Sequence, residues 1–132
     1  DICIEDGLVA LKCDMCNLPF QDNSQDYITS IASFHHIATN ERRIEALNEM
    51  KRVLRPGGKI LLSVWSINQP EKTRRTFTKY GDTMVPWNRP GLETMRYYYI
   101  FKLIEIRGLI NECGLTVEKC TWECGNEVFI LS

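Results

Sequence analysis

Apolar residues recur along this chain in two patterns, one typical of strands and one of helices. Short, mostly apolar runs that suit strands of a sheet occupy residues 8–13, 26–32, 59–65, 115–123 and 127–131. Apolar residues three or four positions apart predict helices at 40–54 and 102–113. Pro56-Gly57-Gly58 should stop the first helix, and Gly125-Asn126 favours a hairpin turn between the last two strands.

The order of these elements predicts an α/β fold in one domain, residues 1–132. We expect a doubly wound, mostly parallel sheet with a C-terminal antiparallel hairpin strand. Residues 66–99 look mostly irregular, so we expect a long loop on the substrate side at 67–99. Residues 1–7 show no helical crossover of the kind that a parallel sheet needs. We therefore expect the N-terminal part of the fold to be missing from this sequence.

Composition and charge narrow the class of protein only slightly. The 132 residues are 44% hydrophobic with a formal net charge of −1, which is ordinary for a globular protein. Since no membrane span or signal pattern appears, we expect no membrane partner and a cytoplasmic location, with an additional nuclear location left open. Contact with a polyanion would have to use local basic patches, such as residues 72–75.

Six cysteines leave a metal site open as a minor alternative. Cys13 and Cys16 have zinc-ligand spacing, and Cys120 with Cys124 would complete a four-sulfur set. Because Cys13 and Cys120 lie in expected strands, we favour reduced, partly buried thiols and no metal.

Two adjacent histidines, His35 and His36, follow the expected strand at 26–32. A turn comes next, in which Thr39 or Asn40 can cap the following helix. In an open α/β sheet, ligands bind beyond the carboxyl ends of the strands. The paired imidazoles should therefore lie where a substrate is held. The alternative is a structural histidine, His36 more than His35, that bonds the Thr39 turn.

Two segments resemble the second half of the class I S-adenosylmethionine-dependent methyltransferases. They are Leu54-Arg-Pro-Gly-Gly-Lys-Ile-Leu61 and Cys13-Asp-Met-Cys-Asn-Leu-Pro-Phe20. A narrower resemblance is carried, in order, by residues 30–43, Val64-Trp65, Val85-Pro-Trp87 and Met95-Arg-Tyr-Tyr-Tyr-Ile-Phe101. These stretches are similar to the eukaryotic tRNA methyltransferases that esterify 5-carboxymethyluridine at the wobble position.

This resemblance implies S-adenosylmethionine as methyl donor and the tRNA anticodon loop as substrate. It also implies a small zinc-binding activator protein on the edge strand, here residues 8–13. Catalytic roles would fall to His35, His36 and Arg96. Substrate binding would fall to Trp65, Trp87, Tyr98 and Arg75. Cofactor binding would fall to Asp1, Asp14, Met15, Ser30, Ile31 and Ala32.

The chemistry of esterification shapes these roles. A carboxylate is already ionised at neutral pH, so we expect the histidines to position the substrate and not to carry protons. Trp65 and Trp87 have the flat apolar rings on which bases stack, and Arg96 suits a phosphate or a carboxylate. Core packing of Trp65 or of one tyrosine, and a turn-capping role for Asp14, remain alternatives.

Two other functions remain as alternatives to tRNA methylation. One is a small-molecule methyltransferase of the quinone or sterol type, against which the basic, tryptophan-bearing segment 66–99 argues. The other is a methyltransferase-like scaffold without a cofactor. The family's Gly-rich first loop is absent from this sequence, and that absence is the scaffold hypothesis's sole support.

Overall fold

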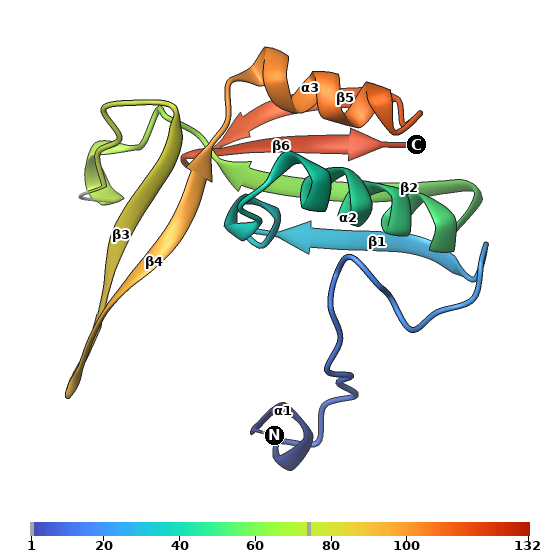
Figure 1. Ribbon diagram of the computed structural model, residues 1–132, viewed down its shortest axis with the longest axis horizontal. Helices are drawn as coiled ribbons and strands as arrows, with labels where there is room; N and C mark the ends of the chain where they lie inside the picture. Colours follow the sequence, from blue (N-terminus) through green and yellow to red (C-terminus); the bar gives the residue numbers. More distant parts are fainter. Residues whose placement is uncertain (1, 74) are drawn as a thin grey trace.

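The computed structural model describes residues 2–73 and 75–132, and it contains a four-stranded sheet and a separate two-stranded one (Figure 1). The larger sheet has the order β1-β2-β6-β5. Its strands are β1 (Gln25–Ile31), β2 (Leu54–Trp65), β5 (Val117–Glu123) and β6 (Asn126–Leu131). β1 and β2 are parallel, and β6 is antiparallel to both of its neighbours. The expected α/β class with an antiparallel C-terminal strand is confirmed.

Helices α2 (Asn40–Val53) and α3 (Leu103–Glu112) pack against each other and against this sheet, so they cover the same face (Figure 1). The hydroxyl of Thr39 accepts from the Arg42 N–H at 3.3 Å and caps the start of α2, as its sequence predicted. Completely buried side chains from the helices and strands form the core, among them Phe34, Leu47, Ile60, Leu62, Ile106 and Phe129. This core supports the carboxyl ends of β1 and β2 from below.

The Pro-Gly-Gly segment lies at the start of β2, which is longer than its apolar run suggested. A Cβ added at Gly58 would lie 2.7 Å from the backbone oxygen of Asp26 in β1. A glycine at this position therefore allows β2 to approach β1 closely.

The expectation of a mostly irregular loop over residues 67–99 is wrong. A short 3-10 turn, η2 (Glu71–Thr73), is followed by strands β3 (Gly81–Arg89) and β4 (Leu92–Ile100), which form a hairpin that projects from the body (Figure 1). Gly91 has a φ of 79° in the connecting turn, as suits Gly after Pro90. Pro86 lies within β3, and because β3 pairs only with β4 among the described residues, it is an edge strand, which tolerates proline.

Two expectations for the N-terminal segment are also wrong. Residues 2–5 form a short helix, α1 (Ile2–Glu5), where no helical period was evident. Residues 8–13 form no strand, and Leu8, Val9 and Leu11 are exposed. An apolar run becomes a strand only where a neighbouring strand pairs with it, and β1 has its described partner in β2 alone.

Candidate functional site

The carboxyl end of β1 leads into a tight turn that carries both histidines. Ala32 has a φ of 51°, a left-handed conformation that costs a non-glycine residue about 1–2 kcal/mol. Its N–H donates to the backbone oxygen and the hydroxyl of Ser63 in β2, both at 3.2 Å. The chain then forms a single 3-10 turn, η1 (Phe34–His36). The strained residue thus directs the histidines over the end of the parallel strand pair.

His35 lies in the interior, with no exposed surface. The backbone N–H of Trp65 donates to its Nδ1 at 3.0 Å, so the ring proton is on Nε2. That nitrogen is buried and makes no well-formed hydrogen bond in the described part of the chain. Burial and, second, the neighbouring His36 lower the pKa of His35 from 6.5 to about 3. The expected direct contact of His35 with a substrate is therefore corrected, because the ring is inside the protein.

His36 is exposed, and its ring is fixed from one side. Its Nδ1 donates to the backbone oxygen of Tyr97 in β4 at 2.8 Å, and its ring packs on Tyr98 at 4.3 Å between centroids. In the neutral ring, Nε2 then carries the lone pair and acts as an acceptor. His36 bonds the hairpin and not the Thr39 turn that the alternative reading proposed.

Arg43 joins the histidine turn to the β3–β4 hairpin, although it is only 2% exposed. Its guanidinium donates to the backbone oxygens of Ile37 at 3.0 Å and Ala38 at 3.2 Å, and to the Tyr97 hydroxyl at 3.3 Å. It also lies 3.8 Å from the centre of the Tyr99 ring. These contacts hold the segment after the histidines against β4.

The aromatic ring of Trp65, at the end of β2, has a partner on each face. Tyr98 stacks on one face at 4.0 Å with an interplanar angle of 6°, and the Arg75 guanidinium lies over the ring at 4.3 Å. Phe77 contacts it at 5.6 Å. Tyr98 is only 3% exposed, so its expected contact with substrate is corrected to a packing role. Trp65 and Arg75 remain at the surface of the cluster.

Trp87 and Arg96 come together farther out on the hairpin. The Arg96 guanidinium lies 3.7 Å from the centre of the Trp87 ring. Arg96 comes two residues before Tyr98 in β4, toward the hairpin turn, so the pair lies outward from His36 and Trp65. The structure thus separates the predicted site residues into an inner cluster and an outer pair.

The residues predicted to hold a cofactor fall around β1. Met15, Leu18, Ser30 and Ser33 line a cavity of about 240 Å³. The hydroxyl of Ser30 is buried there without a hydrogen-bond partner among the described residues. Ile31 is 63% exposed on the other side of the strand. Asp1 lies outside the described residues.

Asp14 caps a turn, as the alternative to a cofactor-binding role predicted. Its carboxylate accepts from the Cys16 N–H at 2.9 Å and from the Arg42 guanidinium at 2.5 Å. The Cys16 N–H and then Arg42 lower the pKa of this carboxyl. A carboxylate has about four acceptor positions, so these bonds leave room for a ligand's N–H donor.

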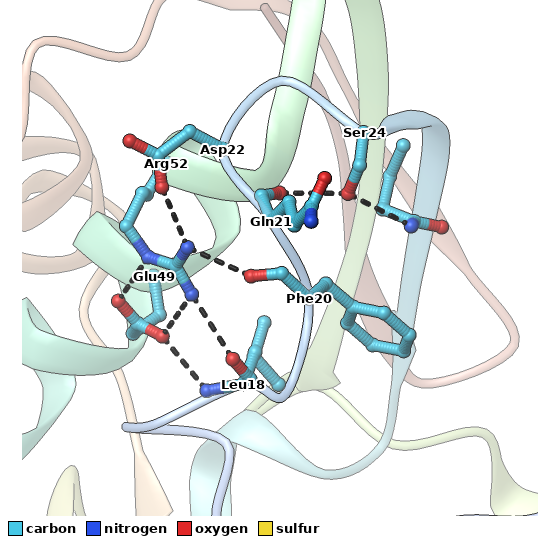
Figure 2. A network of polar contacts seen from close by, with 8 residues as sticks. Leu18, Phe20, Gln21, Asp22, Ser24, Glu49 and Arg52 are labelled. Carbon is cyan, nitrogen blue, oxygen red and sulfur yellow. Dashed lines mark hydrogen bonds and ion pairs between the residues drawn. The ribbon is translucent and has the colours of Figure 1, made fainter.

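An ion-pair network fixes the segment that follows Asp14 and Met15 (Figure 2). Glu49 and Arg52 of α2 are joined by two contacts of 2.7 and 2.8 Å. Glu49 accepts from the Leu18 N–H, while Arg52 donates to the backbone oxygens of Leu18 and Phe20. Arg52 lowers the pKa of Glu49 to about 2. One wall of the cavity is therefore anchored to a helix.

Sequence reasoning missed the roles of Arg43 and Tyr97. Arg43 occupies the same face of α2 as the buried Leu47 and Met50, at positions i, i+4 and i+7. A cation on an apolar stripe signals an internal partner, and this signal was available in the sequence. The contribution of Tyr97 was not, because it depends on the hairpin.

Two further findings concern metals and membranes. Within residues 2–73 and 75–132, no group of three His, Cys, Asp or Glu side chains lies together so as to hold a metal ion. No helix in the same ranges has the length and apolarity to span a membrane.

Comparisons with known proteins give the class of this fold. A family model described as a methyltransferase domain matches residues 4–62. An S-adenosylmethionine-dependent methyltransferase from Clostridium acetobutylicum superposes with a TM-score of 0.72 at 12% identity, over 99% of this chain and 68% of that one. The chain has the fold of the class I S-adenosylmethionine-dependent methyltransferases.

Sequence relatives define the family more narrowly. The mouse "Probable tRNA methyltransferase 9B" is 51% identical over 83 residues, which are 63% of this chain and 18% of that protein. The tRNA (carboxymethyluridine(34)-5-O)-methyltransferase of Arabidopsis thaliana is 39% identical over 113 residues, 79% of this chain and 28% of that protein. Over the matched residues this chain is similar to tRNA methyltransferases, and it spans under a third of the length of either relative.

Proposed function

We propose that this protein transfers a methyl group from S-adenosylmethionine to the carboxylate of 5-carboxymethyluridine at the tRNA wobble position. The observation that carries the proposal is the His36 turn, which lies at the carboxyl ends of β1 and β2 and is bonded to a hairpin bearing Trp87 and Arg96. This is the edge of an α/β sheet at which ligands bind. The named relatives supply the substrate.

The cavity beside β1 fits part of the cofactor. The buried, unpaired hydroxyl of Ser30 offers a polar contact there, and Met15 with Leu18 gives an apolar wall. Asp14 and Met15 would hold the adenine, and Ser30 to Ala32 would lie along the rest of the molecule. When bound, S-adenosylmethionine supplies a methyl group on a positively charged sulfur.

The protein's own residues then have only to position the nucleoside. A carboxylate needs no general base, because it is ionised at neutral pH. With its Nδ1–H held by the Tyr97 oxygen, His36 directs Nε2 toward the nucleoside. In favourable cases, positioning of this kind lowers the activation free energy by roughly 7–11 kcal/mol.

We also propose a protein partner and a cellular location. The exposed apolar residues Leu8, Val9 and Leu11 offer a surface for the small zinc-binding activator, although they form no strand. We propose that the reaction takes place in the cytoplasm. Fluorescence microscopy of the tagged protein would test this location. Pull-down by the purified activator, lost on changing Leu8 and Leu11 to Ser, tests the partner.

The central experiment mixes the full-length protein with methyl-labelled S-adenosylmethionine and tRNA from cells that lack the esterification. Label should enter tRNA and be released by mild alkali, because a methyl ester hydrolyses and a methylated base does not. His36→Ala should lower the rate about 10²-fold, as misplacement of a substrate does, while the lost bond to Tyr97 should cost only about 1 kcal/mol of stability. Alkali-stable label, or label found only in small molecules, would overturn the proposed reaction.

A further inference from the structure

One face of the β3–β4 hairpin differs chemically from the other. Paired residues of an antiparallel ladder share a face, and faces alternate along each strand. The register pairs Thr83 with Tyr98, Val85 with Arg96 and Trp87 with Thr94, so these six residues share one face. This set is called the Trp87 face below. It continues onto Trp65, which stacks on Tyr98.

Each end of the Trp87 face carries an arginine stacked on a tryptophan. Arg96 lies 3.7 Å from the Trp87 ring centre, and Arg75 lies 4.3 Å from the Trp65 ring centre. The two tryptophans come from different strands, and the arginines from β4 and from the segment after η2. The same arrangement therefore occurs twice along one strip of surface.

Acidic side chains of the hairpin belong to the opposite face. Asp82 pairs with Tyr99 and Glu93 with Asn88, out of phase with the Trp87 face. Asp82 also accepts from the Tyr97 hydroxyl at 2.6 Å. The positive charges of Arg75 and Arg96 thus meet no carboxylate from the hairpin on their own side, which favours an anionic ligand.

A recess lies beside the inner part of this strip. Arg75, Phe77, Thr83 and Val85 line a cavity of about 400 Å³ between β3 and the segment that precedes it. From Tyr98 to Thr94 the strand rises about 13 Å. Stacked bases rise about 3.4 Å each, so the strip is long enough for several nucleotides.

We propose that the Trp87 face binds the unpaired nucleotides that flank the target nucleoside, with bases stacked on Trp87 and on the Arg75 guanidinium that covers Trp65. Single-stranded RNA is recognised by stacking on aromatic rings and guanidinium planes, which is the chemistry found at both ends of the strip. This inference rests on the proposed function for the identity of the target. It adds a binding surface that is separate from the transfer site.

The test measures RNA binding by the full-length protein without cofactor. The probes are a fluorescent anticodon stem-loop and a fully paired duplex of the same composition. Trp87→Ala should weaken stem-loop binding about 5- to 150-fold, since each stacked base contributes roughly 1–3 kcal/mol. Trp87→Phe should retain most of the affinity because it keeps a ring, and the duplex should bind weakly to all variants.

Met95→Ala is the matched control. Met95 is 51% exposed on β4 but pairs with Pro86 on the opposite face, so stem-loop affinity should change less than about twofold. Circular dichroism of each variant checks that the hairpin is folded. Equal affinities for wild type, Trp87→Ala and Met95→Ala would overturn the inference. Equal losses in folded Trp87→Ala and Met95→Ala would also overturn it, because the effect would not depend on the face.

The outcome is distinguishable from failure of the proposed function. If the protein forms methyl esters on tRNA but the hairpin variants bind RNA normally, the proposed role of the Trp87 face is wrong and the proposed reaction is supported. If stem-loop binding depends on the hairpin but no alkali-labile methylation occurs, the proposed reaction is wrong and the binding surface is supported.

Discussion

His35 and His36 are adjacent in the chain and have opposite surroundings. His35 is enclosed between the ends of β1 and β2, and its Nδ1 accepts from the Trp65 N–H. His36 is exposed and donates to β4. The 3-10 turn that contains both places successive side chains about 120° apart, so one can enter the core while the other faces the hairpin.

The burial of a neutral His35 predicts a pH-dependent stability. Between pH 6.5 and about 3 the unfolded chain protonates this ring and the folded chain does not, so stability falls as pH falls through this window. At pH 5 the loss is about 2 kcal/mol. In His35→Asn, Oδ1 replaces Nδ1 as the acceptor and nothing titrates. Urea unfolding at pH 7 and pH 5 should show a smaller loss in the variant by about that amount. An equal loss in both proteins would contradict a buried, neutral ring.

At the scale of elements, one buried cation reinforces the contact between the histidine turn and β4. Arg43 reaches from α2 to two loop carbonyls and to Tyr97 of β4. The buried guanidinium makes no ion pair among the described residues, so hydrogen bonds and the Tyr99 ring compensate for its desolvation.

Arg43→Met should lower the free energy of unfolding by about 2–4 kcal/mol, because loop carbonyls lose their donors in a buried site. The neighbouring Arg42 provides a matched control, since its pairs with Asp14 and Glu45 are exposed. Arg42→Met should cost less than about 1 kcal/mol. Tyr97→Phe should cost about 1 kcal/mol and also lower the methyl-transfer rate. Urea unfolding measures the first two effects, and similar values for the two arginine variants would refute the role of Arg43.

At the scale of the whole molecule, three separate parts converge at one end of the sheet. The segment before β1 supplies one wall of the cavity, the turn after β1 supplies His36, and the hairpin after η2 supplies the aromatic surface. The reaction requires no proton transfer, because the nucleophile is a carboxylate that is already ionised. These side chains therefore need only to position the substrate and the cofactor.

This arrangement predicts methyl transfer without a solvent isotope effect. Single-turnover rates in D₂O and H₂O should agree within about 20%, since no proton transfer accompanies the displacement. Quenched-flow measurement with labelled cofactor provides the test. A rate about twofold or more slower in D₂O would mean that a proton moves in the rate-limiting step, and general-base catalysis by His36 would replace positioning.

Local patterns predicted much of the fold because they are enforced locally. The period of α2 and its Thr39 cap have short-range causes, and both are present as expected. The hairpin turn between β5 and β6 is present too, but it lies at Cys124-Gly125, one residue before the expected Gly125-Asn126, because Asn126 already pairs with Glu123. The hairpin was missed because Pro86 breaks the strand pattern, and only pairing with β4 shows that it is tolerated there. The run at residues 8–13 was misassigned because apolar alternation does not reveal whether a strand partner exists.

The sequence by itself determined the α/β class, the family resemblance and the place of the two histidines after a central strand. These follow from periodicity and from short motifs whose residues are neighbours in the chain. Only the tertiary structure decided which imidazole is buried, that Arg43 connects the turn to β4, and that two arginine–tryptophan stacks share one strip. Those facts depend on contacts between segments some 30 to 60 residues apart, such as His35 with Trp65 and His36 with Tyr97, and no local pattern encodes them.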